Sequence, residues 1–193
     1  MMPKRRGPRF FWMVLLLVAG CAQTEPAAPP PGAWLEPGVR MVLPPAGITP
    51  ELRRQQLLTG RFGGQVQSLV VMLNADDHQV VLAGLSSVGI RLFLATYDSD
   101  GLRLEQSVIV GQLPPPGQVL ADIMLSYWPA AAFDPYLPDG WTLRDQDESR
   151  ELRNPQGELV TEIRYQKDGD RREPVSIQQN VFAYKIAIQN IGE

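Results

Sequence analysis

Few side chains of this 193-residue sequence have the chemistry of a reactive site. The single histidine, His78, follows two carboxylates, Asp76 and Asp77. An imidazole beside two carboxylates could move a proton or hold a cation. The trio nevertheless lies between two strand-like runs and has the composition of a polar hairpin tip, which offers no cleft for a substrate. We therefore predict a structural turn at these residues.

The other candidate groups fit a catalytic pattern no better. Ser86 and Ser87 lie in a turn-forming group and are not part of a nucleophile elbow. One histidine cannot build a site that needs two imidazoles, which excludes the usual zinc hydrolases. Asp122 lies among Leu, Ile and Met, where a carboxylate must be paired or face water, and we predict a hydrogen-bonded or exposed helix residue. The sequence thus predicts no catalytic residue, no metal site and no cofactor, and we expect a protein that is not an enzyme.

Cys21 is the only cysteine, and its surroundings are typical of an exported protein. Four cations, at positions 4, 5, 6 and 9, precede an apolar run over residues 10–18 that is too short for a permanent membrane span. Val18-Ala19-Gly20-Cys21 resembles the lipobox of bacterial lipoproteins, which implies cleavage after residue 20 and acylation of Cys21 with palmitate-type chains. The alternative is an ordinary cleaved signal peptide with a cysteine there by chance.

The same resemblance implies a location. The residue after the cysteine is Ala22 and not Asp, which implies a lipid anchor in the outer membrane, on its periplasmic face. Removal of the four cations in residues 1–20 leaves 14 Lys and Arg of 18 against 21 Asp and Glu, a net charge of −7. So negative a chain is a poor partner for nucleic acid or for an anionic lipid surface. We expect the chain to be held at the membrane through its lipid anchor.

The residues from Cys21 onward divide into a tether and one domain. Residues 21–45 are predicted to be the lipidated N-terminus and a Pro-rich tether, irregular over residues 34–45. The domain is predicted to cover residues 46–193, a length that buries a core without disulfides. Thr49-Pro50-Glu51 has the composition of a helix start and predicts a short helix to about residue 59.

Two sets of strand-like runs follow, and the short turn-forming groups between them predict antiparallel neighbours. The first set covers residues 65–74, 79–85, 90–97 and 102–110, and the second covers 141–145, 150–153, 158–165, 175–180 and 182–190. Between the sets, residues 118–128 have helical spacing with only a narrow polar stripe, which places this helix in a core. We predict a mainly β fold with helices, in which a strongly curved antiparallel sheet, an incomplete barrel, is wrapped around this central apolar helix.

Four stretches resemble a family of bacterial lipoproteins, the domain-of-unknown-function three-two-six-one family. They are Val88-Gly89-Ile90-Arg91-Leu92-Phe93, Val119-Leu120-Ala121-Asp122, Trp128-Pro129 and Tyr184-Lys185-Ile186. The resemblance covers nearly all of residues 57–191. It implies a fold similar to LolA and LolB, the periplasmic carrier and outer-membrane receptor for lipoproteins, in which an incomplete barrel encloses an apolar cavity. It also implies a link to aryl polyene lipids, because genes of the family often lie among genes for those pigments.

These observations predict an outer-membrane lipoprotein whose apolar cavity binds or transfers a lipid or an acylated molecule in envelope biogenesis. The expected cavity residues are apolar side chains of the central helix and of the facing strands: Leu82, Phe93, Val119, Leu120, Ile123, Met124 and Tyr127. The alternative is a structural or scaffolding lipoprotein that fills its sheet with its own side chains and binds other envelope proteins. Open apolar space beside the central helix distinguishes the two hypotheses.

The lipid-anchor hypothesis is tested by Cys21→Ser. The variant is expected to fold and to leave the membrane fraction, because the apolar segments after residue 20 are too short or too periodic to anchor the chain. Fractionation of cells after a salt wash measures this. A Ser variant that stays with the membranes would contradict the hypothesis.

Overall fold

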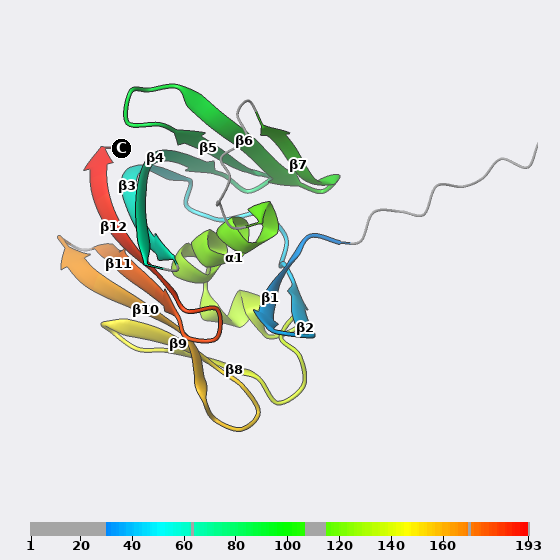
Figure 1. Ribbon diagram of the computed structural model, residues 1–193. Coiled ribbons are helices and arrows are strands. Elements are labelled where there is room, and N and C mark those ends of the chain that lie inside the picture. Colours follow the sequence, from blue (N-terminus) through cyan, green and yellow to red (C-terminus); the bar gives the residue numbers. More distant parts are fainter. Residues whose placement is uncertain (1–29, 63, 107–114, 170, 193) are drawn as a thin grey trace, which may run out of the picture.

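The computed structural model describes residues 30–62, 64–106, 115–169 and 171–192. The predicted signal peptide, Cys21 and the tether up to residue 29 lie outside the described residues, as does the last part of the strand predicted at residues 102–110. Figure 1 shows a mainly β protein, and its described residues form twelve strands, one α-helix and a short 3-10 helix, η1 (Ala130–Phe133).

Ten of the described strands form one antiparallel sheet, built of two meanders. The first meander comprises β3 (Leu52–Phe62), β4 (Gln65–Ala75), β5 (Val80–Leu85), β6 (Arg91–Asp98) and β7 (Gly101–Gln106). The second comprises β8 (Thr142–Asp145), β9 (Ser149–Arg153), β10 (Leu159–Asp168), β11 (Arg171–Gln179) and β12 (Tyr184–Gly192). The strand order is β7-β6-β5-β4-β3-β12-β11-β10-β9-β8, with the edge strands β7 and β8 unpaired to each other, so the sheet is not closed into a barrel. The strands predicted from residue 65 onward are confirmed, with shifts of a few residues at their ends.

The prediction of a short helix from residue 49 to residue 59 is wrong, because these residues contribute most of β3. β3 pairs with β4 along its whole length, from Leu52 opposite Ala75 to Phe62 opposite Gln65, and it pairs with β12 on its other side. Neighbouring strands thus provide backbone partners on both edges of β3. The helix signal was confined to residues 49–51, and this long-range pairing outweighs it.

The prediction that residues 34–45 are irregular is also wrong. β1 (Gly32–Glu36) and β2 (Val39–Val42) pair around a turn in which Gly38 has a φ of 85°, a conformation that glycine adopts without strain. The hairpin buries alternate apolar side chains in the core, namely Ala33, Leu35 and Met41. The folded unit therefore includes residues that the sequence assigned to the tether. The alternation that forms the hairpin is short and lies between prolines, which concealed it.

Helix α1 (Pro116–Tyr127) confirms the helix predicted at residues 118–128. It begins after Pro115 and ends at Trp128, where the backbone becomes extended. All residues from 120 to 126 are buried. Figure 1 shows α1 between the two meanders, with the β1–β2 hairpin beside it. A helix that is buried around its whole circumference is a core element, so both meanders are positioned by the same helix.

The second meander holds the C-terminal end of α1 through Arg150 on β9. The Arg150 guanidinium is buried and donates to the carbonyl oxygens of Leu125 and Trp128, at 2.6 and 2.7 Å. A cation at this position also interacts favourably with the negative end of the helix dipole. Arg150 forms an ion pair with the Asp145 carboxylate of β8 at 2.7 Å. The buried positive charge of Arg150 is therefore compensated by the helix carbonyl oxygens on one side and by the Asp145 carboxylate on the other.

Tyr165 and Arg172 extend this contact across β10 and β11. The Tyr165 hydroxyl donates to the carbonyl oxygen of Ser126 at 3.0 Å, and the Arg172 guanidinium lies 3.6 Å from the centre of the Tyr165 ring. Arg172 also pairs with Asp145 at 2.7 Å. Burial by itself would raise the pKa of Asp145, but hydrogen bonds and charges of the two arginines outweigh burial and lower that pKa. The carboxylate that orients both arginines is therefore stable as an anion.

Arg150→Met is expected to lower the free energy of unfolding by about 3 kcal/mol, because two helix carbonyl oxygens lose their buried donor. Chemical denaturation of the full chain measures this. The control Arg164→Met removes an exposed ion pair with Glu162 and is expected to cost less than about 1 kcal/mol. Equal losses in the two variants would show that Arg150 does not anchor α1.

Candidate functional site

Asp76, Asp77 and His78 form the turn between β4 and β5, which confirms the predicted hairpin tip. One Asp76 carboxylate oxygen accepts hydrogen bonds from the backbone N–H groups of His78 and Gln79, at 2.8 and 2.9 Å. These bonds stabilise the carboxylate and lower the pKa of Asp76. The His78 side chain is 84% exposed. In the part of the chain that the structure describes, no three His, Cys, Asp or Glu side chains are placed to hold a metal ion.

The seven residues predicted to line a lipid cavity all lie in the core or against it. Leu82, Leu120 and Met124 keep at most 1% of their surface exposed, and Ile123 and Phe93 are also buried. Val119 and Tyr127 are partly buried. A side chain beside a cavity that admits water retains accessible surface, so the first three residues face atoms of the protein itself. Their contact with a lipid stays a prediction, and it requires the core to open.

Phe93 shows how the space beside the sheet is filled. It lies opposite Gly84 in the pairing of β5 with β6. A Cβ atom added to Gly84 would lie 2.1 Å from Cε1 of Phe93, so the ring occupies the space that a side chain at Gly84 would take. The predicted cavity wall at Phe93 is thus part of the packing of the sheet.

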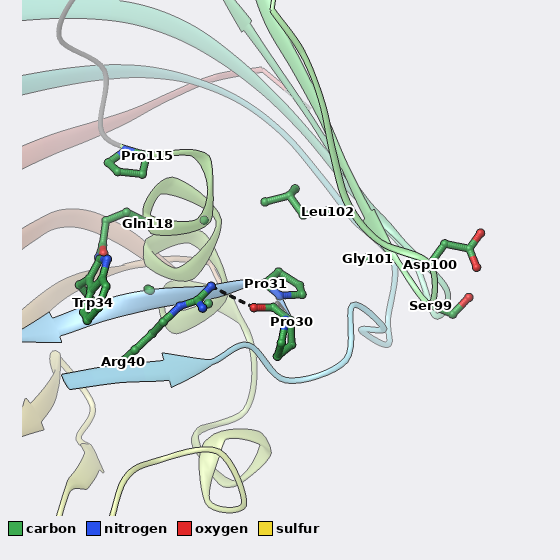
Figure 2. A pocket seen from close by; sticks show the side chains of 13 residues that line it. Pro30, Pro31, Trp34, Arg40, Ser99, Asp100, Gly101, Leu102, Pro115 and Gln118 are labelled. Atoms are coloured by element: carbon green, nitrogen blue, oxygen red, sulfur yellow. Dashed lines mark hydrogen bonds between the residues drawn. The ribbon is translucent and has the colours of Figure 1, made fainter. Parts of the chain in front are cut away.

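A pocket of about 640 Å³ lies at the N-terminal end of α1 (Figure 2). Three parts of the chain surround it: the β1–β2 hairpin with the prolines before it, the β6–β7 turn, and the first turn of α1. Trp34, Arg40, Leu102 and Gln118 are among its lining residues, and the Arg40 guanidinium donates to the carbonyl oxygen of Pro30 at 2.9 Å. This volume is in the range of small-molecule sites. None of the seven predicted cavity residues lines the pocket.

A hydrogen-bonded cluster of Gln118, Asp122 and Tyr184 connects this pocket with β12, a central strand of the sheet. The Gln118 amide nitrogen lies 3.2 Å from the Tyr184 hydroxyl and 3.5 Å from one Asp122 oxygen. The Tyr184 hydroxyl of β12 donates to the other Asp122 oxygen at 2.8 Å. Burial raises the pKa of Asp122 to about 7, although the hydrogen bonds from Tyr184 and Gln118 act in the opposite direction. Asp122 is therefore the hydrogen-bonded helix residue that the sequence predicted.

The walls of this pocket come from segments that no motif in the sequence connects. Trp34 and Arg40 lie in the hairpin that was assigned to the tether, and Leu102 belongs to a strand in the middle of the chain. Only the tertiary fold brings these segments together. One signal in the sequence is the turn-forming pair Pro37-Gly38 between two short apolar runs, which is consistent with a hairpin. In the structure, buried and exposed residues alternate along both strands of this hairpin, which places Trp34 at the domain surface.

The fold and the site define a class: a mainly β protein with an open antiparallel sheet, one buried helix and a pocket at the start of that helix. The chain belongs to the family described as "Protein of unknown function (DUF3261)", whose model matches residues 53–192. This match confirms the family resemblance seen in the sequence. No curated protein matches the chain. Among the residues that the structure describes, none of the helices has the length and apolar character needed to cross a membrane.

Asp122 is expected to make the stability of the fold depend on pH. Its pKa rises from 3.8 to about 7 on folding, so the folded state binds the proton more tightly than the unfolded chain. The resulting stabilisation is complete below about pH 4 and is lost as the pH rises to about 7. Asp122→Asn cannot ionise and should remove this dependence.

Thermal unfolding of the unaltered chain and of Asp122→Asn at about pH 5 and about pH 8 measures the effect. We expect the melting temperature of the unaltered chain to fall more between these two conditions than that of the Asn variant. Parallel changes in both proteins would refute the role assigned to Asp122.

Proposed function

We propose that this protein is an outer-membrane lipoprotein that binds an apolar or acylated molecule in the pocket at the start of α1 and holds it or passes it on in envelope biogenesis. The pocket is the observation that carries the proposal. Trp34, Ala33, Leu102 and the prolines before β1 give it apolar walls. Removal of apolar ligand surface from water contributes about 25 cal/mol per Å², so an acyl chain needs no charged partner there.

The position of the pocket along the chain supports a ligand that comes from the membrane. Pro30, at the edge of the pocket, is nine residues after Cys21. A chain of this length spans at most about 30 Å when fully extended. An acyl anchor on Cys21 would therefore keep the pocket close to the lipid surface. A molecule that leaves the bilayer would meet the pocket within that distance.

We further propose that the sheet and α1 form a carrier-like fold similar to LolA and LolB, with the sheet curved around the helix. The open edge of a large antiparallel sheet and the burial of α1 between two meanders support this similarity. The ligand site in the proposal is the pocket and not the interior, because Leu82, Leu120 and Met124 are already closely packed. An aryl polyene lipid, the class that the family resemblance implies, has the required apolar character.

A scaffolding role is the second candidate function, and the closely packed core favours it. A sheet filled by its own side chains needs no ligand for stability. In that case the pocket would be a contact surface for another envelope protein. The net charge of −7 after residue 20 disfavours nucleic acid as a partner under either function.

Leu102→Trp distinguishes the two functions. Leu102 lines the pocket, whereas Leu104, two residues further along β7, is 41% exposed and outside it. With a fluorescent long-chain fatty acid as the probe, we expect the full chain and the control Leu104→Trp to bind equally. Leu102→Trp should fill the pocket and weaken binding by at least about tenfold, a loss of about 1.4 kcal/mol. Its melting temperature should stay unchanged because the pocket has space for the ring.

The contrary outcomes are distinct. A full chain that does not bind the probe would favour the scaffold. Ile123→Trp serves as a second variant for the predicted interior cavity, because overpacking a filled core costs about 1 to 3 kcal/mol. Loss of probe binding in Ile123→Trp at an unchanged melting temperature would move the ligand site from the pocket to the interior.

A further inference from the structure

Two cations face each other on the side of the sheet that points away from α1. Arg61 on β3 and Lys185 on β12 are directly opposite in the strand register. The preceding residue on β12, Tyr184, points toward α1, since its hydroxyl bonds to Asp122. Successive side chains of a strand point to opposite faces, so Lys185 and its partner Arg61 lie on the outer face. Like charges directly opposite each other on neighbouring strands are destabilising.

Among the described residues, no carboxylate forms an ion pair with Arg61 or Lys185. Lys185 lies opposite Gln178 of β11, and Gln178 lies opposite Glu162 of β10. Glu162 is two strands from Lys185, about 10 Å away, and is already paired with Arg164 at 2.8 Å. Among the ion pairs of the described residues, none includes Arg61 or Lys185. The repulsion between the two cations is therefore uncompensated within these residues.

Both cations border a pocket of about 420 Å³ between two turns. Gly64, between β3 and β4, lies on one side, and Asn180 and Ala183, between β11 and β12, lie on the other. The Gln178 side chain also lines the pocket and donates one amide hydrogen to Asn180 Oδ1 at 3.0 Å. Its amide carries a second hydrogen, which is a neutral donor for a bound group.

The turn that borders this pocket has a strained backbone. Ala183 has a φ of 53°, and it is the only non-glycine residue with a positive φ among those described. Gln179 fixes the turn, because its Oε1 accepts from the Phe182 N–H at 2.7 Å and its Nε2 donates to the Leu35 carbonyl oxygen at 3.2 Å. Strain that is held in place by a buried side chain is a feature of binding sites.

We propose that this outer pocket binds one phosphate-class anion, a phosphate monoester or the phosphate of a single lipid headgroup, between Arg61 and Lys185. The planar guanidinium can donate two parallel hydrogen bonds to phosphate oxygens, and the ammonium adds a compact charge. One bound anion also relieves the repulsion within the cation pair. The net charge of −7 after residue 20 opposes an extended anionic polymer, which limits the ligand to a single anionic group. The two cations lie on the opposite face from α1, and their site is independent of the function proposed for the first pocket.

Titration of the full chain with inorganic phosphate at low ionic strength tests the proposal, with calorimetry and thermal unfolding as readouts. We expect saturable binding that raises the melting temperature of the unaltered chain. Arg61→Gln and Lys185→Gln should each weaken binding at least tenfold. Arg164 lies on the same face but is paired with Glu162. The control Arg164→Gln should therefore bind phosphate as tightly as the unaltered chain does. In phosphate-free buffer Arg61→Gln should melt no lower than the unaltered chain, because it removes a repulsion.

A second titration identifies the source of the phosphate. Tighter binding of a water-soluble short-chain phosphatidic acid than of inorganic phosphate, lost in Arg61→Gln and Lys185→Gln, supports a lipid headgroup at this site. Binding at this site that is no tighter than that of inorganic phosphate supports a free phosphate compound. Any binding of short-chain phosphatidylcholine, which has no net charge, should be the same in the unaltered chain and in the variants Arg61→Gln and Lys185→Gln. The absence of saturable phosphate binding, or an equal loss in Arg164→Gln, would overturn the proposal.

Discussion

The burial of α1 around its whole circumference is the constraint on which the rest of the structure depends. A helix in this position must find partners within the protein for each polar group that it carries. The sheet supplies them from separate strands. Gln56 of β3 donates to the Tyr127 hydroxyl at 2.6 Å, and Tyr184 of β12 donates to Asp122. Arg150 of β9 donates to the carbonyl oxygens of Leu125 and Trp128 at the C-terminal end of the helix. The strands must therefore pair in one register, because a slip of one residue would turn these side chains to the outer face.

Much of the fold could be predicted from local patterns. Alternation and turn residues located the strands from β4 onward, and the nearly unbroken apolar character of residues 118–128 located the buried helix. The prediction failed where the pattern depends on distant partners. The residues of β3 carry polar side chains on the inner face, such as Gln56, whose partners are Tyr127 and Asn190. Such inward-facing polar residues interrupt the alternation of apolar and polar residues that marks a strand. Their place in the core is explained only by their partners in the folded structure.

The candidate sites were harder to predict for the same reason. Apolar side chains at Leu82 and Met124 indicated a cavity, yet side chains that fill a core and side chains that line a cavity have the same composition. The pocket at the start of α1 and the cation pair of Arg61 and Lys185 both depend on which segments become neighbours. Asp122 was the exception, because a carboxylate within an apolar helix requires a partner wherever the helix is placed.

The pairing of β3 with β12 has a consequence for how the chain reaches this structure. The two strands lie near opposite ends of the folded sequence, and they are the single seam that joins one meander to the other. Each meander can form from contacts between neighbours, but closing the seam requires a long loop of chain to be ordered first, which slows folding. Until β12 arrives, β3 and β11 present open edges to other chains. The newly made chain is thus most prone to aggregation in the interval before β12 pairs with β3.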